Sequence, residues 1–123
     1  MPVVHIMHNA NCAIHKNVAP IEGEKVITKN YVNSFRETDL REYLTLKSID
    51  RLVIVGMQTH LCLEGATRAA ADFGYKVVVV HDACATRDLT FNEQTVAATQ
   101  VHLSTLSTLK SYAKVVSLKE FLK

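Results

Sequence analysis

Residues 52–62 read LVIVGMQTHLC, and this stretch decides the predicted fold. Residues 52–55 form a continuous apolar run, which is typical of a strand buried on both faces of a parallel sheet. Residues 59–73 are rich in alanine and predict a helix, with Gly74 as its C-terminal cap. Cys62 therefore lies on the first turn of a helix that directly follows a buried strand.

The flanking segments continue this alternation of strands and helices. Strands are predicted at 3–7, 25–28, 77–80 and 115–116, a loop at 9–17, and helices at 39–47, 90–113 and 118–122. Thr38 is the expected N-cap of the first of these helices. Thr90 and Glu93 form a capping box that opens the longest helix. In this helix we place Val96, Val101, Leu106 and Leu109 near the inner face.

Short connections between alternating strands and helices predict right-handed crossovers. The expected fold class is therefore α/β, with a parallel sheet and helices on both faces. The sequence contains no linker, repeat or low-complexity segment, so we expect a single domain over residues 1–123.

Composition argues against several classes of protein. The net charge of +2 is spread along the chain, without the basic run typical of nucleic-acid binding. No apolar run approaches the roughly 20 residues of a membrane span, and the N-terminus lacks signal-peptide features. The three cysteines, Cys12, Cys62 and Cys84, have no disulfide-framework spacing, which favours a cytoplasmic protein. We expect neither nucleic acid nor membrane as a partner.

In an open parallel sheet, ligands bind beyond the carboxyl ends of the strands. Four positions follow predicted strands: His8, Lys29, the turn at 56–62, and Asp82. A cysteine attacks as the thiolate, which the positive end of a helix favours. Cys62 is therefore a candidate nucleophile, and the alternative is a small residue that packs in the core.

Other polar residues have open or mainly structural interpretations. Lys29 could supply positive charge to a reaction, or it could be an edge lysine that reaches solvent. His60 lies two residues before Cys62, about 200° away around a helix, so it is a poor general base for this thiol. We expect His60 to line a pocket or a subunit contact. His102, in mid-helix, and Asp82 are expected to be structural.

The N-terminal histidines raise the question of a metal site. His5 and His8 are three residues apart on a predicted strand, so their side chains point to opposite faces. His8, Cys12 and His15 could converge through the loop between them, yet no closely spaced pair of ligands supports this. We expect no metal and no other cofactor.

Three segments together resemble the isochorismatase-like cysteine hydrolases. They are VAPIEGEKVITKNYVNSFRETDL (18–40), LVIVGMQTHLCLEGATRAAADFGYKVVVVHDACATRD (52–88) and VHLSTLSTLKSYAKVVS (101–117). The specific feature is their combination: a strand-end lysine, the GMQTHxC turn and the GYxVxVVxDA strand. The resemblance implies a Rossmann-like, three-layer α/β/α fold.

The resemblance also implies an Asp-Lys-Cys catalytic triad, in which Cys62 is the nucleophile and Lys29 the lysine. It places a cis peptide between Met57 and Gln58, which directs the Gln58 N–H, with that of Cys62, into an oxyanion hole. Four residues near these positions are candidates to line the pocket: Thr59, His60, Asn33 and Phe35.

The chain departs from the family pattern in two places. The family begins with a strand that ends in the triad aspartate, within a D-x-Q-x-x-F stretch, and nothing before Val3 supplies it. In the family's strand order, 3-2-1-4-5-6, this strand is central. We therefore expect an N-terminally incomplete domain or a rebuilt sheet, with a gap and unpaired backbone groups between the strands at 3–7 and 52–55. Asp82 is a weaker candidate for the acid.

The second departure is the loop HNANCAIHKN (8–17), which is shorter than the family's usual connection. It lacks the D-x-H of the nicotinamidase branch, which argues against that branch.

The leading functional hypothesis is a hydrolase that attacks an amide-type C–N bond of a small molecule through a thioester on Cys62. Retention of the cysteine favours this reaction over the vinyl-ether cleavage of other members. The alternatives are a non-catalytic or fragmentary member kept for assembly or small-molecule binding, and a redox-sensing thiol protein. The resemblance and the small residues of the helices also predict a homo-oligomer.

Overall fold

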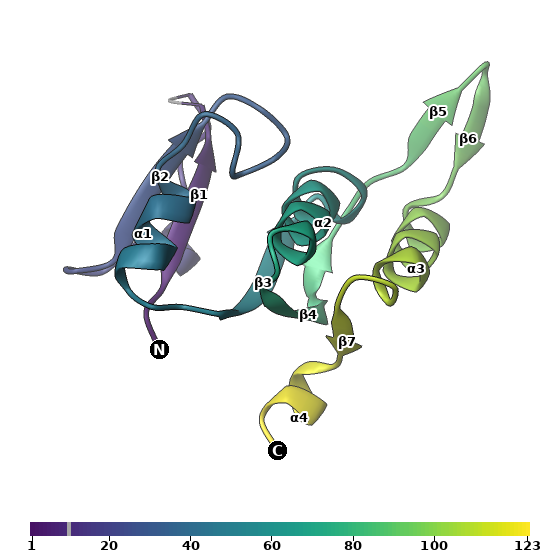
Figure 1. Cartoon of the computed structure of the whole chain (residues 1–123). Coiled ribbons are helices and arrows are strands. Elements are labelled where there is room, and N and C mark those ends of the chain that lie inside the picture. Colours follow the sequence, from purple (N-terminus) through teal and green to yellow (C-terminus); the bar gives the residue numbers. More distant parts are fainter. Residues whose placement is uncertain (10) are drawn as a thin grey trace. The chain divides into compact units, whose positions relative to one another are not determined.

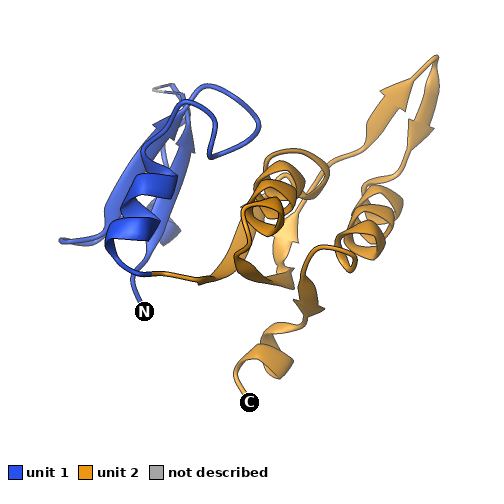
Figure 2. Cartoon of the chain, in the orientation of Figure 1, with its two compact units in different colours: residues 1–48 blue, residues 49–123 orange. Residues whose placement is uncertain are grey.

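The computed structural model describes residues 1–9 and 11–123 (Figure 1). Residue 10, which belongs to the predicted loop at 9–17, lies outside the described residues. The chain divides into two compact units, residues 1–48 and residues 49–123 (Figure 2). A single domain over the whole chain stays a prediction.

The first unit pairs two strands in parallel. β1 (Val4–His8) runs beside β2 (Lys25–Lys29), with the last pair in register being His8 and Lys29. Between them lies the short 3₁₀ helix η1 (Lys16–Val18), and after them comes the helix α1 (Leu40–Leu46). The core residues of this unit are Ile27 on β2 and Leu40 and Leu44 on α1.

The N-cap predicted for α1 was wrong by one residue. Asp39 occupies the cap position, and its side chain forms an ion pair with Lys25 instead of capping the helix. The hydroxyl of Thr38 donates to the carbonyl of Ser34 at 2.6 Å. The N–H of Leu40 donates to the hydroxyl oxygen of Thr38 over a long distance of 3.4 Å. A tertiary ion pair and a local turn have therefore replaced the local cap.

The second unit contains a parallel sheet of three strands, in the order β3-β4-β7. The strands are β3 (Arg51–Met57), β4 (Lys76–Ala85) and β7 (Lys114–Val116). Their connections contain the helices α2 (Glu64–Asp72) and α3 (Ala98–Leu109), and α4 (Leu118–Phe121) follows β7. Val77, Val79 and Val80 of β4 are buried at the centre of this unit. The predicted α/β fold with parallel strands is confirmed.

β3 is less buried than its apolar sequence predicted. Val53, Val55 and Met57 alternate along the strand and are 37%, 54% and 69% exposed. The expectation of two covered faces was therefore wrong for this strand. Within the described residues of the second unit β3 pairs only with β4, so its other edge has no strand partner there. The gap predicted between the strands at 3–7 and 52–55 stays a prediction. An edge strand has fewer neighbours to cover its side chains.

The long helix predicted from residue 90 was wrong at its beginning. Residues 89–96 form an antiparallel hairpin of β5 (Leu89–Phe91) and β6 (Gln94–Val96). Asn92 and Glu93 have φ values of 47° and 64°, as in a two-residue hairpin turn. Asparagine tolerates this left-handed backbone conformation well. Thr90 therefore faces Thr95 across the hairpin instead of capping a helix.

Helix α3 obtains its N-terminal contact from another segment. The carboxylate of Asp88 accepts a hydrogen bond from the backbone N–H of Ala98 at 2.7 Å. Val101, Leu106 and Leu109 are buried as predicted, whereas Val96 lies in β6 and is exposed.

Helix α2 begins later than predicted and ends where predicted. Residues 59–63 form a π-helical turn, η2 (Thr59–Leu63), and the α-helix starts at Glu64. At the other end Gly74 has a φ of +92°. The N–H of Gly74 donates to the carbonyl of Ala71, and the N–H of Tyr75 donates to that of Ala70, at 2.9 and 3.0 Å. This is a Schellman motif, which favours glycine at its left-handed position.

Asp82 does not lie at a strand end, because β4 continues to Ala85. Its carboxylate accepts a hydrogen bond of 2.7 Å from the backbone N–H of Leu118, at the start of α4. This contact is structural, and it joins β4 to the C-terminal helix. Within the described residues, no helix combines the length and the apolar composition needed to cross a membrane.

Thr67, on α2, provides a test of the packing of the second unit. Its side chain is fully buried, and its hydroxyl has no hydrogen-bond partner within the described residues. A buried hydroxyl without a partner costs about 1–3 kcal/mol. The substitution Thr67→Val should therefore raise the free energy of unfolding by about 1 kcal/mol, measured by urea denaturation.

Thr59→Val is the matched control for this experiment. Thr59 is equally buried, but its hydroxyl is hydrogen-bonded to His102. The same change should here lower the free energy of unfolding by about 1 kcal/mol. If both substitutions changed the free energy of unfolding in the same direction, the distinction between an unpaired hydroxyl at Thr67 and a hydrogen-bonded one at Thr59 would be contradicted.

Candidate active site

The turn that follows β3 holds most of the predicted site residues of the second unit. Gly56 has a φ of +124°, a conformation that other residues rarely adopt. The peptide bond between Met57 and Gln58 is cis, at the position that the resemblance implied. The carbonyl of Gln58 accepts hydrogen bonds from the N–H groups of Leu61 and Leu63, at 3.0 and 3.3 Å. These two bonds close the π-helical turn in which Cys62 lies, half-buried.

A partly buried hydrogen bond joins this turn to α3. The hydroxyl of Thr59, which is fully buried, lies 2.9 Å from Nδ1 of His102. The two residues are 43 positions apart in the sequence. His102 was expected to have a structural role, but its contact with the turn was not foreseen.

The segment after β4 contacts the turn from another direction. Nδ1 of His60 lies 2.5 Å from the hydroxyl of Thr86, and Nε of Arg87 donates to the side-chain oxygen of Gln58 at 3.0 Å. Sequence reasoning missed Thr86 and Arg87 as contacts of the site. The strand predicted at 77–80 ends well before these two residues, and only the extension of β4 to Ala85 puts them at the end of a strand, where ligand-binding residues gather.

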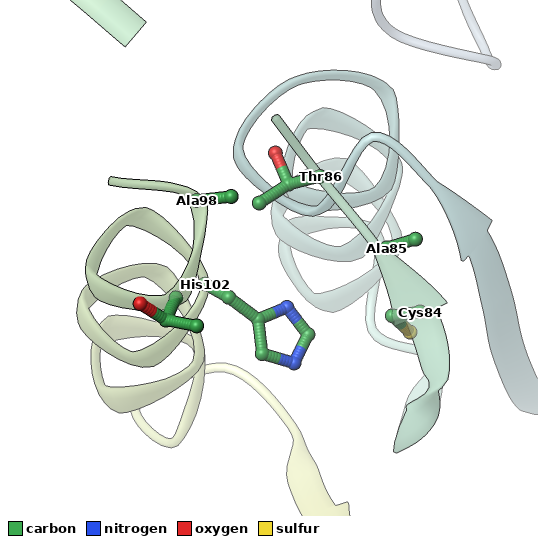
Figure 3. Close-up of a pocket in the computed structure, with 6 residues that line it drawn as sticks. Cys84, Ala85, Thr86, Ala98 and His102 are labelled. Atoms are coloured by element: carbon green, nitrogen blue, oxygen red, sulfur yellow. The ribbon is translucent and has the colours of Figure 1, made fainter. Parts of the chain in front are cut away.

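A shallow pocket of about 190 Å³ lies beside these contacts (Figure 3). In Figure 3 the ring of His102 projects from α3 toward the end of β4. The residues that line the pocket come from the end of β4, the residue after it and the first turns of α3. They are Cys84, Ala85, Thr86, Ala98, Thr99 and His102. Two of them, Thr86 and His102, are hydrogen-bonded to residues of the turn. The pocket and the turn therefore share side chains.

The three cysteines have different surroundings. Cys12 is exposed, and Cys62 and Cys84 are half-buried. Burial raises the pKa of the Cys84 thiol, and the nearby carboxylate of Asp82 also raises it, against an opposing hydrogen bond from Gly56. The thiol of Cys84 lies 3.2 Å from the carbonyl of Val80, as a donor. Cys84 is thus held in its protonated form and is a poor nucleophile.

Lys29 lies in the first unit, at the end of β2, and is only 3% exposed. Its ammonium group donates to Nδ1 of His8 and to the carbonyl of Tyr31, both at 2.8 Å. The alternative of an edge lysine that reaches solvent was therefore wrong. Because an ammonium group has no acceptor, Nδ1 of His8 accepts, and the ring proton of neutral His8 is on Nε2.

Asn33 and Phe35 lie on the loop that follows β2. The side-chain oxygen of Asn33 accepts a hydrogen bond of 3.0 Å from the backbone N–H of Phe35. This contact shapes the loop, and the pocket-lining role of both residues stays a prediction. The other N-terminal histidines have local partners: His5 is paired with Glu24 at 2.7 Å, and His15 accepts from the N–H of Asn17.

Comparison with known proteins identifies the family. The model of the isochorismatase domain matches residues 2–113. The isochorismatase family protein YddQ of Bacillus subtilis is 38% identical over 99% of this chain and 76% of its own length. A crystal structure from Oleispira antarctica, assigned as an isochorismatase hydrolase, superimposes with a TM-score of 0.93 and 46% identity, over 98% of this chain and 71% of that one.

The chain therefore belongs to the isochorismatase family, and its three-layer α/β/α fold class is confirmed. A more distant relative, the maleamate amidohydrolase of Pseudomonas putida, is 31% identical over 66% of this chain. The chain spans 39% of the length of that enzyme. These relatives support a hydrolase.

The burial of Cys84 predicts the order in which the thiols react. At pH 8, Cys84 should be alkylated by iodoacetamide about tenfold more slowly than Cys12, because a raised pKa leaves less thiolate. The difference should shrink as the pH rises through the pKa of Cys84. Peptide mass spectrometry measures both residues in one sample, so that exposed Cys12 is the internal control. Equal rates at pH 8 would contradict the effect of burial.

Proposed function

We propose that this chain is a cysteine hydrolase that cleaves an amide-type C–N bond of a small molecule, with Cys62 as the nucleophile. The observation that carries the proposal is the place of Cys62 in a hydrogen-bonded turn at the carboxyl end of a parallel strand. Ligands of open parallel sheets bind at such ends.

The proposed reaction has two steps. The thiolate of Cys62 attacks the carbonyl carbon, and the tetrahedral intermediate collapses to a thioester as the C–N bond breaks. The leaving nitrogen takes up a proton and departs as ammonia or an amine. Water then attacks the thioester, which releases a carboxylic acid and restores the thiol.

The backbone of the turn suits the charge that develops in this reaction. We assign the N–H groups of Gln58 and Cys62 as donors to the oxyanion. His60 is assigned to the adjoining surface, whereas Thr59 is fully buried and supports the turn from within. Donors that are held in place before the reaction stabilise the transition state without reorganisation. Met57 supplies the other side of the cis peptide.

We assign to Lys29 the cationic role of the family's triad. Its burial and its two fixed hydrogen bonds support this assignment, because a buried ammonium group needs such partners and acts strongly on nearby charge. Asn33 and Phe35 lie on the loop that follows β2, which ends at Lys29, and they are assigned to the substrate pocket.

The substrate class rests on the relatives. Maleamate amidohydrolase is named for an amide substrate, and this chain shares 31% identity with it. We therefore propose a small amide as substrate. We also propose a homo-oligomeric assembly, which the family resemblance implies, and a cytoplasmic location, which the spacing of the cysteines favours.

A non-catalytic, small-molecule-binding protein is the second candidate. It is favoured by the state of two carboxylates near the site: Asp82 and Asp88 each accept a backbone N–H at a helix N-terminus. Asp82 is thereby a poor replacement for the triad aspartate. A folded wild-type chain that releases no ammonia from any amide tested would favour this candidate.

The substitution Cys62→Ala should lower the turnover number at least about 1,000-fold, because it removes the thiol on which the proposed thioester forms. The assay is ammonia release from maleamate and from a panel of small primary amides. Cys12→Ala is the matched control and should retain activity within about threefold, since Cys12 is exposed and is assigned no role in the site. Full activity of Cys62→Ala would exclude the proposed mechanism.

The substitution Lys29→Met should lower kcat about 100-fold or more, because it removes the charge while keeping the length of the side chain. Lys110→Met, which changes an exposed lysine, is the control for the loss of one positive charge. Similar kcat values for both variants would contradict the role assigned to Lys29. Circular dichroism of both variants checks that each remains folded.

A further inference from the structure

Side-chain hydrogen bonds of Gln58, Thr59 and His60 help to hold the turn at 57–62, and they differ in burial. The bond of Arg87 to Gln58 is exposed, and the bond between His60 and Thr86 is partly buried. Water can replace a lost partner at an exposed site, so an exposed bond contributes little to holding the turn.

The bond between Thr59 and His102 is also partly buried, but it differs in that Thr59 itself is fully buried. If His102 moved away, the hydroxyl of Thr59, a residue with no exposed surface, would lose the partner assigned to it. Leaving a buried polar group unpaired is unfavourable, so the bond couples the position of the turn to the position of α3.

The position of Thr59 determines the position of its neighbours. It directly follows Gln58, whose carbonyl accepts the N–H groups of Leu61 and Leu63 on either side of Cys62. A displacement of Thr59 would therefore move the acceptor that closes the π-helical turn, and with it the backbone that carries the thiol.

We propose that His102 is a positioning residue: it holds the buried Thr59 by a hydrogen bond and thereby fixes the turn that presents Cys62. His102 does not touch the reacting atoms in this proposal. The proposal deepens the proposed function, since it concerns the presentation of the same nucleophile.

Four variants separate hydrogen bonding from packing. His102→Leu and Thr59→Val remove the bond and keep most of the side-chain volume. His102→Asn and Thr59→Ser keep a polar group near the original position. The double variant Thr59→Val/His102→Leu tests whether the two residues act through the same bond.

Two measurements on these variants need no substrate. Hydrogen exchange of the peptide that contains Leu61 and Leu63 should become at least about tenfold faster in His102→Leu and in Thr59→Val, while peptides of α2 stay unchanged. In the same two variants the alkylation rate of Cys62 should approach that of exposed Cys12. In His102→Asn and Thr59→Ser the alkylation rate of Cys62 should stay within about threefold of the wild-type rate. The double variant should be no worse than either single variant.

Other results would overturn the proposal. If wild-type Cys62 already reacts like Cys12, the turn gives the thiol no special reactivity. If exchange rises equally over the turn, α2 and α3, His102 is only a packing residue. A failure of the proposed function is distinct from both, because it would appear as a lack of turnover while exchange and alkylation still respond to the variants.

Where turnover is present, it adds a third readout. Loss of positioning should lower kcat at least about tenfold in His102→Leu and leave KM within about threefold, with rescue in His102→Asn. A rise in KM with unchanged kcat would contradict a role in presenting the nucleophile.

Discussion

The parallel pairing of β3 with β4 is the constraint on which the second unit depends. The ladder is regular from Arg51 and Lys76 to Ile54 and Val79, and then becomes irregular before Gly56. After this irregularity Gly56 lies opposite Cys84, and Met57 opposite Ala85. The late part of β4 is thereby carried alongside the turn.

This shift in register explains how separate segments reach one another. Because β4 extends to Ala85, the residues that follow it begin beside the turn. Thr86 and Arg87 then contact the turn, and the next residue, Asp88, contacts the start of α3. A segment of three residues therefore connects the strand, the turn and the helix. The hairpin at 89–96 leaves from this segment and returns to α3.

The buried polar groups of the chain show how the structure accommodates chemistry. Lys29 is almost fully buried and Thr59 is fully buried, and each has an assigned hydrogen-bond partner. Thr67 is buried without such a partner among the described residues, in the middle of α2. Buried polar groups with partners hold a single geometry, whereas one without a partner only reduces stability. The two satisfied groups belong to the proposed chemistry of the protein.

The sequence by itself determined the elements whose signals are local. Apolar runs such as 77–80 predicted parallel strands, and Gly74 predicted a helix end, because a buried strand and a left-handed cap each demand particular residues. The hairpin was missed because Thr90 and Glu93 match a capping box equally well, and only the paired strands distinguish the two. Tertiary structure alone decided the bond between Thr59 and His102, since hydrogen-bond partners 43 positions apart leave no local pattern.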